Sequence, residues 1–503
     1  MHTKRPLHAV AFFLALVPFV LSDSSTGELE PSDLSAQQPK LLFVAELCRH
    51  GDRTPLAQFP SDALPAYKWP EGIGELTAIG QRAHYELGKR LRQRYVDTGF
   101  LPEAYSPRDV YVRSTDIDRT LVSATSQMTG LYPPGTAANT DVRVRFGNDP
   151  LHENEGGLPH LFQPVPVHTQ SKDNDMLLLP DHNCPRQDRN LHHMYKAPEF
   201  REKVRQERHF LRTLAKIAKV DPDTFTVWNA ERLSDTWTVF QHHSVPLPEK
   251  ATPDIVAHAR NLSYWLITYM NQGIEQNRLR GGLILYTVSE YMAMAALKYQ
   301  RRLPLEYQGD HKKFVLLSAH DTTVTATLSA LQAFDGINPP YNSTLIWEFY
   351  VGHDDAYFIK VEYNGNPVLL PGCSDVMCPV IEYIQSTAKR TVEGEFKKNI
   401  ECMVGFGHFA ALVNSWFRKL HPKENLINLA FSPDDQNDES GSSVVTSIIA
   451  VVCGFLVLIG AVGIASRMRS RYNGYVRAND ASIDAVYRQP IMQDVVSDRR
   501  ILM

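Results

Sequence analysis

The sequence predicts an α/β domain in which helices flank a mostly parallel sheet, with an inserted helical cap and one C-terminal transmembrane helix. Short apolar runs alternate with amphipathic helical patterns around polar turns, which is typical of α/β domains. A stretch at about 150–280 is rich in charge and histidine and shows only helical patterns. Near the C-terminus lies a run of 22 residues without a charge, which is long enough to span a membrane.

The composition is that of an ordinary globular protein, with 43% hydrophobic and 21% charged residues. This composition excludes a fibrous or wholly disordered chain. Lysine and arginine number 52 against 56 acidic residues, so the formal net charge is −4 and no nucleic-acid partner is indicated.

The elements of the domain are predicted from the period of their apolar residues. Continuous apolar runs indicate buried strands, and apolar residues at steps of three and four indicate helices. In chain order we expect a strand at 41–47, a helix at 76–95, a strand at 110–112, a helix to about 129, a helix at 283–299, a strand at 314–318 and a helix at 322–331. Within the insertion, helical patterns occur at 200–220 and 255–269.

The N-terminus predicts entry into the secretory pathway. Lys4 and Arg5 precede an uncharged run at 9–21 that ends in small polar residues, so residues 1–23 are interpreted as a cleaved signal peptide. The sequons at Asn261 and Asn342 would then be available for glycosylation.

The C-terminus predicts a membrane anchor. Residues 444–465 would extend about 33 Å as a helix, enough to cross a bilayer core. An acidic stalk at 432–443 precedes this segment and three arginines follow it directly. The positive-inside rule therefore places the 466–503 tail in the cytosol and the 40–431 domain in the lumen or outside the cell.

The densest group of chemical side chains is Arg49–Pro55 (RHGDRTP), directly after the first predicted strand. Ligands of open α/β sheets bind beyond the carboxyl ends of strands, and arginine matches phosphate oxygens bidentately. Arg49 and Arg53 disfavour an imidazolium at His50, so its pKa should lie below the reference of about 6.5. His50 is therefore a candidate nucleophile toward phosphorus. The alternative is a solvated basic turn.

Two further segments are expected near this loop. His320 and Asp321 lie between a predicted strand and a helix, and Asp321 could protonate a leaving alcohol, chiefly at low pH. Arg119 lies in the first turn of a predicted helix, where an anion is already favoured. The alternative for Arg119 is exposure beside neighbouring aspartates. The similar pair His353–Asp354 has a hydrophilic context typical of an exposed turn between strands.

Metal and cofactor chemistry is not indicated by the sequence. The chain lacks an HExxH motif, a CxxC motif and a Walker A loop. The adjacent pairs His192–His193 and His242–His243 have no zinc-type spacing and are interpreted as solvated. Five of the six cysteines precede the predicted span, and Cys48 is the expected free thiol because it ends an apolar strand.

On these residues the chain resembles the histidine acid phosphatases, and within them the prostatic and lysosomal type. The resemblance covers roughly residues 40–402. The segments that match are Arg49–Pro55, Tyr111–Leu121 (YVRSTDIDRTL), Gln163–Thr169 (QPVPVHT), Ser318–Val324 (SAHDTTV) and Pro371–Cys373 (PGC). The resemblance implies the histidine phosphatase fold, which is like that of phosphoglycerate mutase, with a helical cap.

The resemblance also implies the roles of individual residues. His50 would be the phosphoacceptor and Asp321 the proton donor, while His320 would contact phosphate. The arginines Arg49, Arg53 and Arg119 would clamp the phosphate, and no metal or other cofactor would be used.

The cysteines and one aromatic position show where the chain follows the family and where it departs from it. The resemblance implies the disulfides Cys184–Cys402 and Cys373–Cys378, whereas both cysteines of a third family bridge are absent. The resemblance also implies a homodimer, but a tryptophan that supports dimerisation in the family is replaced here by Phe162.

The function expected on this basis is a metal-independent acid phosphatase that hydrolyses small phosphomonoesters through a phosphohistidine. Two alternatives stay open: a narrower phosphatase for inositol, lipid or nucleotide phosphates, and a non-enzymatic surface glycoprotein that uses the scaffold for binding. No tyrosine of the tail completes the usual endocytic pattern, so the lysosomal membrane and the cell surface are competing destinations.

Overall fold

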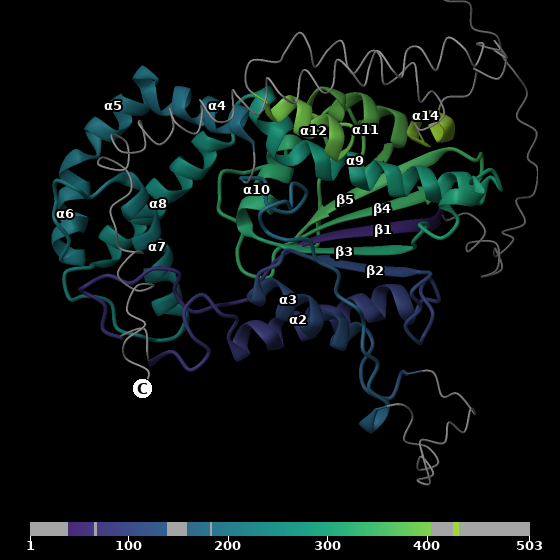
Figure 1. Cartoon of the computed structure of the whole chain (residues 1–503), viewed down its shortest axis with the longest axis horizontal. Helices are drawn as coiled ribbons and strands as arrows, with labels where there is room; N and C mark the ends of the chain where they lie inside the picture. Colours follow the sequence, from purple (N-terminus) through teal and green to yellow (C-terminus); the bar gives the residue numbers. More distant parts are fainter. Residues whose placement is uncertain (1–38, 65–67, 138–157, 182–183, 404–425, 432–503) are drawn as a thin grey trace, which may run out of the picture. The chain divides into compact units, whose positions relative to one another are not determined.

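The computed structural model describes residues 39–64, 68–137, 158–181, 184–403 and 426–431 (Figure 1). The described residues from Lys40 onward belong to one compact unit. The predicted signal peptide, stalk, transmembrane segment and tail lie outside these ranges. None of the helices within them combines the length and apolar character that a membrane span requires.

The centre of this unit is one seven-stranded mixed sheet (Figure 1). Its strands are β1 (Lys40–Arg49), β2 (Val110–Ser114), β3 (Phe314–Ala319), β4 (Thr344–Val351), β5 (Tyr357–Tyr363), β6 (Asn366–Pro367) and β7 (Met377–Pro379). The order is β2-β3-β1-β4-β5-β6, and β7 also pairs with β5.

The expectation of a mostly parallel sheet is wrong. Only β2 with β3 and β3 with β1 pair in parallel, whereas β1–β4, β4–β5, β5–β6 and β5–β7 are antiparallel. For β4 and β5 the reason is their connection, which is a short turn rather than a crossover helix, and a short turn joins only antiparallel strands. His353 and Asp354 are exposed in this turn, as predicted.

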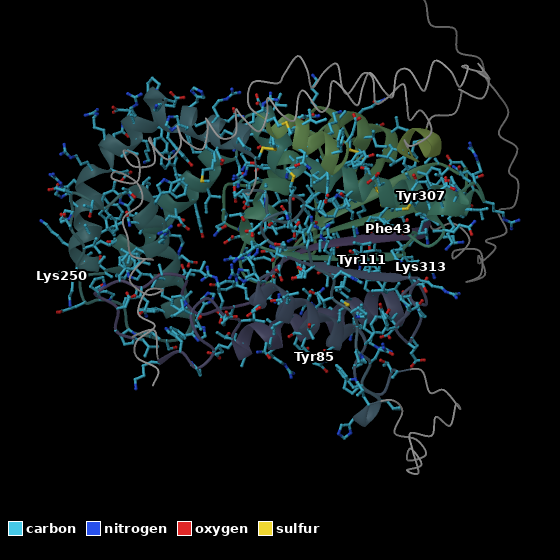
Figure 2. All side chains as sticks on the ribbon, viewed as in Figure 1. Phe43, Tyr85, Tyr111, Lys250, Tyr307 and Lys313 are labelled. Atoms are coloured by element: carbon cyan, nitrogen blue, oxygen red, sulfur yellow. A yellow bond between two sulfur atoms is a disulfide. The ribbon has the colours of Figure 1, made fainter. Side chains whose placement is uncertain are left out.

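Helices cover both faces of the sheet, because the side chains of β1 are apolar on both faces. Val44 and Cys48 face α2 (Ala78–Leu91) and α3 (Asp118–Leu131). On the other face Phe43, labelled in Figure 2, packs on Tyr291 of α9. The helices on that face are α9 (Ile274–Tyr299), α10 (Asp321–Ala330), α11 (Val380–Thr387) and α12 (Gly394–Cys402), with α14 (Leu426–Phe431) against α9. Cys48 is buried and is the free cysteine of the described residues.

The cap has its own apolar core, which includes Leu214, Trp237 and Leu266. Its helices are α4 (Pro185–Lys196), α5 (Pro198–Gln206), α6 (Arg208–Ala218), α7 (Val227–His242) and α8 (Pro253–Met270). The helix expected at 200–220 is therefore two helices. The described cap is also smaller than 150–280, because His168 forms a bridge to Arg113 of β2 and α9 packs on the sheet.

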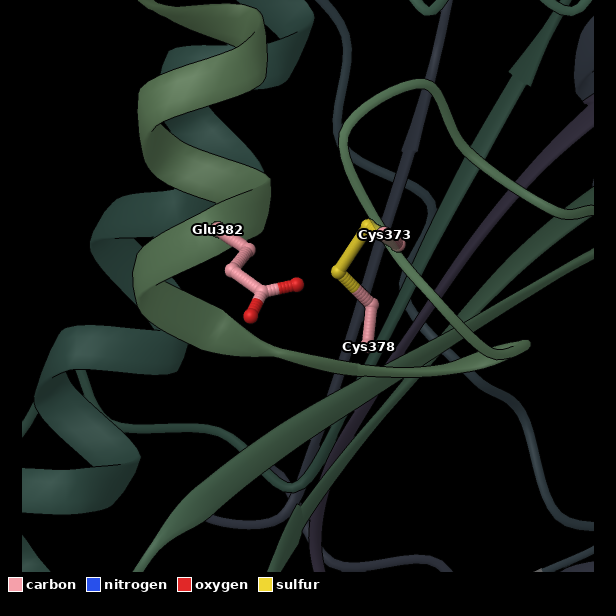
Figure 3. Close-up of side chains that lie close together, drawn as sticks. All are labelled: Cys373, Cys378 and Glu382. Atoms are coloured by element: carbon pink, nitrogen blue, oxygen red, sulfur yellow. A yellow bond between two sulfur atoms is a disulfide. The ribbon is translucent and has the colours of Figure 1, made fainter. Parts of the chain in front are cut away.

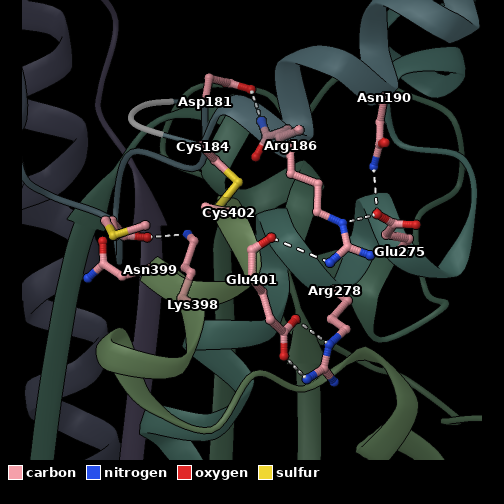
Figure 4. Close-up of a disulfide and its surroundings, with 12 residues drawn as sticks. Asp181, Cys184, Arg186, Asn190, Glu275, Arg278, Lys398, Asn399, Glu401 and Cys402 are labelled. Carbon is pink, nitrogen blue, oxygen red and sulfur yellow. Dashed lines mark hydrogen bonds and ion pairs between the residues drawn. A yellow bond between two sulfur atoms is a disulfide. The ribbon is translucent and has the colours of Figure 1, made fainter. Parts of the chain in front are cut away.

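Two disulfides are present, and they are the pairs that the resemblance implied. Cys184–Cys402 connects the start of α4 to the end of α12, and ion pairs such as Arg278–Glu401 lie beside it (Figure 4). Cys373–Cys378 closes a short loop next to α11 (Figure 3).

We expect the two disulfides to differ in their contribution to the free energy of unfolding. Cys184 and Cys402 are 218 residues apart, whereas Cys373 and Cys378 are 5 apart. Because a longer closed loop restricts the unfolded chain more, removing the first pair should cost about 3–5 kcal/mol and the second roughly 2 kcal/mol. Chemical unfolding of the two double cysteine-to-serine variants measures both, and equal losses would contradict the expectation.

Candidate active site

The predicted site segments meet at one edge of the sheet. The parallel strands β1, β3 and β2 end there together, with Arg49 opposite Ala319 and Ser114 opposite Ser318 in register. His50 therefore lies beside His320, with ring centroids 5.6 Å apart. This arrangement follows from the rule that the carboxyl ends of parallel strands share an edge.

His50 is buried and its ring orientation is fixed by its own loop. Its Nδ1 lies 2.8 Å from the carbonyl oxygen of Gly51, which can only accept, so Nδ1 carries the proton and Nε2 keeps its lone pair. Burial lowers the pKa of His50 well below its usual value, and Arg49, Arg119 and Arg53 lower it further. The sequence predicted a lowered pKa of His50 from the arginines alone, but burial is the larger cause of the shift.

Three arginines surround this ring, two from the Arg49–Pro55 loop and one from the start of α3. Arg49 pairs with Asp321 at 2.8 Å, and Arg53 pairs with Asp235 of α7 at 2.9 Å. Nη2 of Arg119 lies 3.4 Å from Nδ1 of His320.

Each of these arginines has a buried N–H donor that is not used in a hydrogen bond within the described residues. The Nε atoms of Arg49, Arg53 and Arg119 are buried and have no hydrogen-bond partner among the described residues. Burial and the nearby Arg53 lower the pKa of Arg119 to about 10. Because a buried N–H group without an acceptor is costly, and three such groups belong to clustered cations, the arrangement favours an anion with several oxygens.

The two residues after β3 differ in charge. The pKa of His320 falls to about 3 through burial and Arg119, so the ring is neutral, and its Nε2 lies 3.0 Å from Oγ1 of Thr115. Burial alone would raise the pKa of Asp321, but Arg49 and Arg53 lower it to about 2. In the free protein the carboxyl group of Asp321 is therefore ionised except at very low pH.

Several residues of the site were not found from the sequence. Asp235 reaches Arg53 from the cap, and the Tyr341 ring lies 4.4 Å from the guanidinium of Arg49. Burial, then Asp235 and Asp321, raise the pKa of Glu231 to about 8. A single sequence carries no local signal for these contacts, because each joins segments far apart in the chain.

The two histidine pairs have different environments. His193 is exposed and His192 only half-buried, as expected for a solvated pair. In the second pair, His242 is exposed as expected. The interpretation of His243 as solvated is wrong, because its Nε2 lies 2.7 Å from Oδ2 of Asp52. The packing of α7 against the Arg49–Pro55 loop is the reason.

One group in the described residues has the proximity that metal ligands need, and it lies outside this site. It consists of Cys373, Cys378 and Glu382 (Figure 3). Both sulfur atoms are committed to the disulfide, so neither is a thiolate that could ligate a cation.

The chain is similar in sequence to proteins of a known family. A model of the histidine phosphatase superfamily (branch 2) matches residues 40–364. The chain is 34% identical to human prostatic acid phosphatase over 70% of this chain and 86% of that protein. It is also 34% identical to bovine lysosomal acid phosphatase, over 70% of this chain and 78% of that one.

Solved structures share the fold. A phytase of Klebsiella sp ASR1 matches with a TM-score of 0.51 at 18% identity, over 70% of this chain and 96% of that chain. A Hafnia alvei phytase in complex with myo-inositol hexakis sulphate matches with a TM-score of 0.51 at 15% identity, over 70% of this chain and 97% of that chain. At these identities the likeness concerns the fold alone.

Proposed function

The chain belongs to the histidine phosphatase superfamily, branch 2, as a histidine acid phosphatase, and we propose that it hydrolyses phosphate monoesters through a phosphohistidine on His50. The proposal rests on one observation. A neutral imidazole with a free Nε2 lies among Arg49, Arg53 and Arg119, each of which has a buried Nε–H group without a partner in the described residues. A phosphoryl group would satisfy these donors and present phosphorus to the nucleophile.

The reaction would take two steps. His50 Nε2 attacks phosphorus, the bond from phosphorus to the ester oxygen breaks, and Asp321 gives its proton to the departing alkoxide. Water then attacks phosphorus and gives a proton to Asp321. The bond between phosphorus and Nε2 of His50 breaks, so phosphate is released and His50 is restored. The arginines supply the positive charge that stabilises the transferring group, so we propose that no metal ion is needed.

The protonation of Asp321 would depend on the substrate. In the free protein its pKa is depressed, so the carboxyl group is ionised from about pH 4 upward and pairs with Arg49. A phosphoryl group between the arginines would draw on their charge and add negative charge beside Asp321. Both effects raise the pKa of a carboxyl group, so substrate binding would favour the protonated form of Asp321.

The test is hydrolysis of p-nitrophenyl phosphate by the full-length chain across about pH 4–8, with and without EDTA. We expect activity that is highest in acid and unchanged by EDTA. A folded protein without activity toward aryl phosphates would contradict a broad phosphatase and favour a binding role or a narrow substrate. Loss of activity with EDTA, restored by a divalent cation, would contradict metal independence.

We further propose that the domain faces the lumen or the cell exterior and is anchored by residues 444–465, at the lysosomal membrane or the cell surface. The disulfides support an oxidising compartment. Of the two sequons, Asn261 is exposed on α8, whereas Nδ2 of Asn342 is buried and leaves no room for a glycan. Removal of N-glycans should therefore change the mobility of wild type, and Asn261→Gln should abolish that change.

A further inference from the structure

The Arg49–Pro55 loop is held from two sides at Asp52. The buried carboxylate of Asp52 accepts a hydrogen bond from Oγ1 of Thr77, at 2.6 Å, where α2 begins. On the other side, Nε2 of His243 lies 2.7 Å from the same oxygen, and Nδ1 of His242 lies 3.3 Å from the other oxygen. Both histidines come from the C-terminal end of α7 in the cap.

His243 is well placed to act as a fixed donor. Its side chain is 16% exposed, whereas that of His242 is 51% exposed. The ring of His243 stands edge-on to Trp69, with centroids 5.2 Å apart. The same helix also contacts the loop through Asp235, which binds Arg53, and α7 is thereby attached to the loop at two points along its length.

One peptide group, that between Gly51 and Asp52, connects Asp52 to the imidazole ring of His50. The carbonyl group of Gly51 belongs to the peptide that joins Gly51 to Asp52, and it accepts the Nδ1 proton of His50. A rotation of this peptide would move the acceptor away from the ring. The loop has little space on the α2 side, because a Cβ atom on Gly51 would come within 2.7 Å of the Gly80 backbone.

We propose that His243, acting through Asp52, is a positioning residue for His50. It holds the Gly51–Asp52 peptide in the orientation that keeps the proton of His50 on Nδ1 and directs Nε2 toward the substrate. The cap thereby takes part in the chemistry of the sheet edge, although no cap residue is the nucleophile. This inference rests on the proposed phosphohistidine mechanism.

The test separates the hydrogen bond of His243 from its packing. His243→Phe keeps an aromatic ring against Trp69 but removes the donor, whereas His243→Gln keeps an N–H donor at nearly the position of Nε2. In the full-length chain we expect kcat to fall about 10–100-fold in His243→Phe, with KM changed less than about threefold, because the arginines that bind phosphate remain. His243→Gln should recover most of kcat.

The control is His209→Phe, a change on an exposed position of α6 in the same cap, which should leave kcat at the wild-type value. Inactive wild type would refute the proposed function itself. If wild type is active, unchanged kcat in His243→Phe would overturn the inference, as would a His243→Gln variant as slow as His243→Phe.

Folding is checked by the rise in melting temperature that inorganic phosphate produces, which each variant should retain. If His243→Phe does not fold, Asp52→Leu serves instead, since it keeps nearly the same shape but removes both oxygen atoms that Thr77, His243 and His242 contact. A wild-type kcat in Asp52→Leu would then overturn the inference.

Discussion

Replacing His50 with alanine is expected to abolish turnover and to leave phosphate binding intact. The change removes the nucleophile, and losses of about 10⁴–10⁶-fold in kcat are typical when a covalent nucleophile is removed. Arg49, Arg53 and Arg119 keep their buried donors, so phosphate should still raise the melting temperature of the variant. Steady-state hydrolysis of p-nitrophenyl phosphate measures the first effect and thermal unfolding the second.

The covalent intermediate gives an independent readout of the same prediction. Wild type mixed with a ³²P-labelled monoester and quenched in alkali should retain label, because phosphohistidine is stable in base and labile in acid. His50→Ala should retain none, and His353→Ala, a change in the exposed β4–β5 turn, should behave as wild type. Label that persists in His50→Ala would place the phosphoryl group on another residue.

The location of the site could be predicted from the sequence because its chemistry lies next to strong local signals. The apolar run at 41–47 ends one residue before Arg49 and His50, and the run at 314–318 ends one residue before His320 and Asp321. Buried strands of this kind are recognised without knowledge of their partners. That two of them pair in parallel, and so deliver both motifs to one edge, is the step that the structure confirms.

The direction of the remaining strands could not be predicted in the same way. β4 is as apolar as a parallel strand, with only Tyr350 partly exposed, but it pairs with β1 in the antiparallel direction. Strand direction depends on how the chain returns to the sheet, which is a long-range property. The exposed turn around His353 and Asp354 was the available signal, since a short turn implies an antiparallel pair.

The contributions of the cap were missed for a related reason. Asp235 and His243 reach the Arg49–Pro55 loop across 182 and 191 residues of sequence. In the sequence both belong to an ordinary helix that has charged and histidine side chains, for which solvation is the usual outcome. Burial was missed too, and with it the main reason why the pKa of His50 is low.

Asp321→Asn is expected to lose activity in proportion to the basicity of the leaving alcohol. Asparagine has nearly the same shape but cannot give a proton to the departing oxygen. An alkyl phosphate such as β-glycerophosphate, whose alkoxide needs that proton, should lose about 10²–10⁴-fold in kcat. p-Nitrophenyl phosphate, whose phenolate leaves readily without a proton, should lose about tenfold or less. Equal losses on both substrates would mean that Asp321 acts only in holding the site together.

Asp321→Asn is also expected to change inhibition by inorganic phosphate, because the variant lacks the negative charge of Asp321. In the free protein the carboxylate pairs with Arg49 at 2.8 Å and therefore competes with phosphate for that cation. Removing the negative charge frees Arg49 and removes repulsion of the phosphate, so Asp321→Asn should be inhibited by inorganic phosphate at lower concentrations than wild type. The difference should be largest toward neutral pH, where wild-type Asp321 is ionised even beside phosphate, and should shrink in acid, where bound phosphate shares its site with a protonated carboxyl group. The carboxyl group that would donate a proton in the transition state thus weakens ground-state binding of phosphate while it is ionised, and tighter inhibition by phosphate is expected together with the loss of kcat on alkyl phosphates.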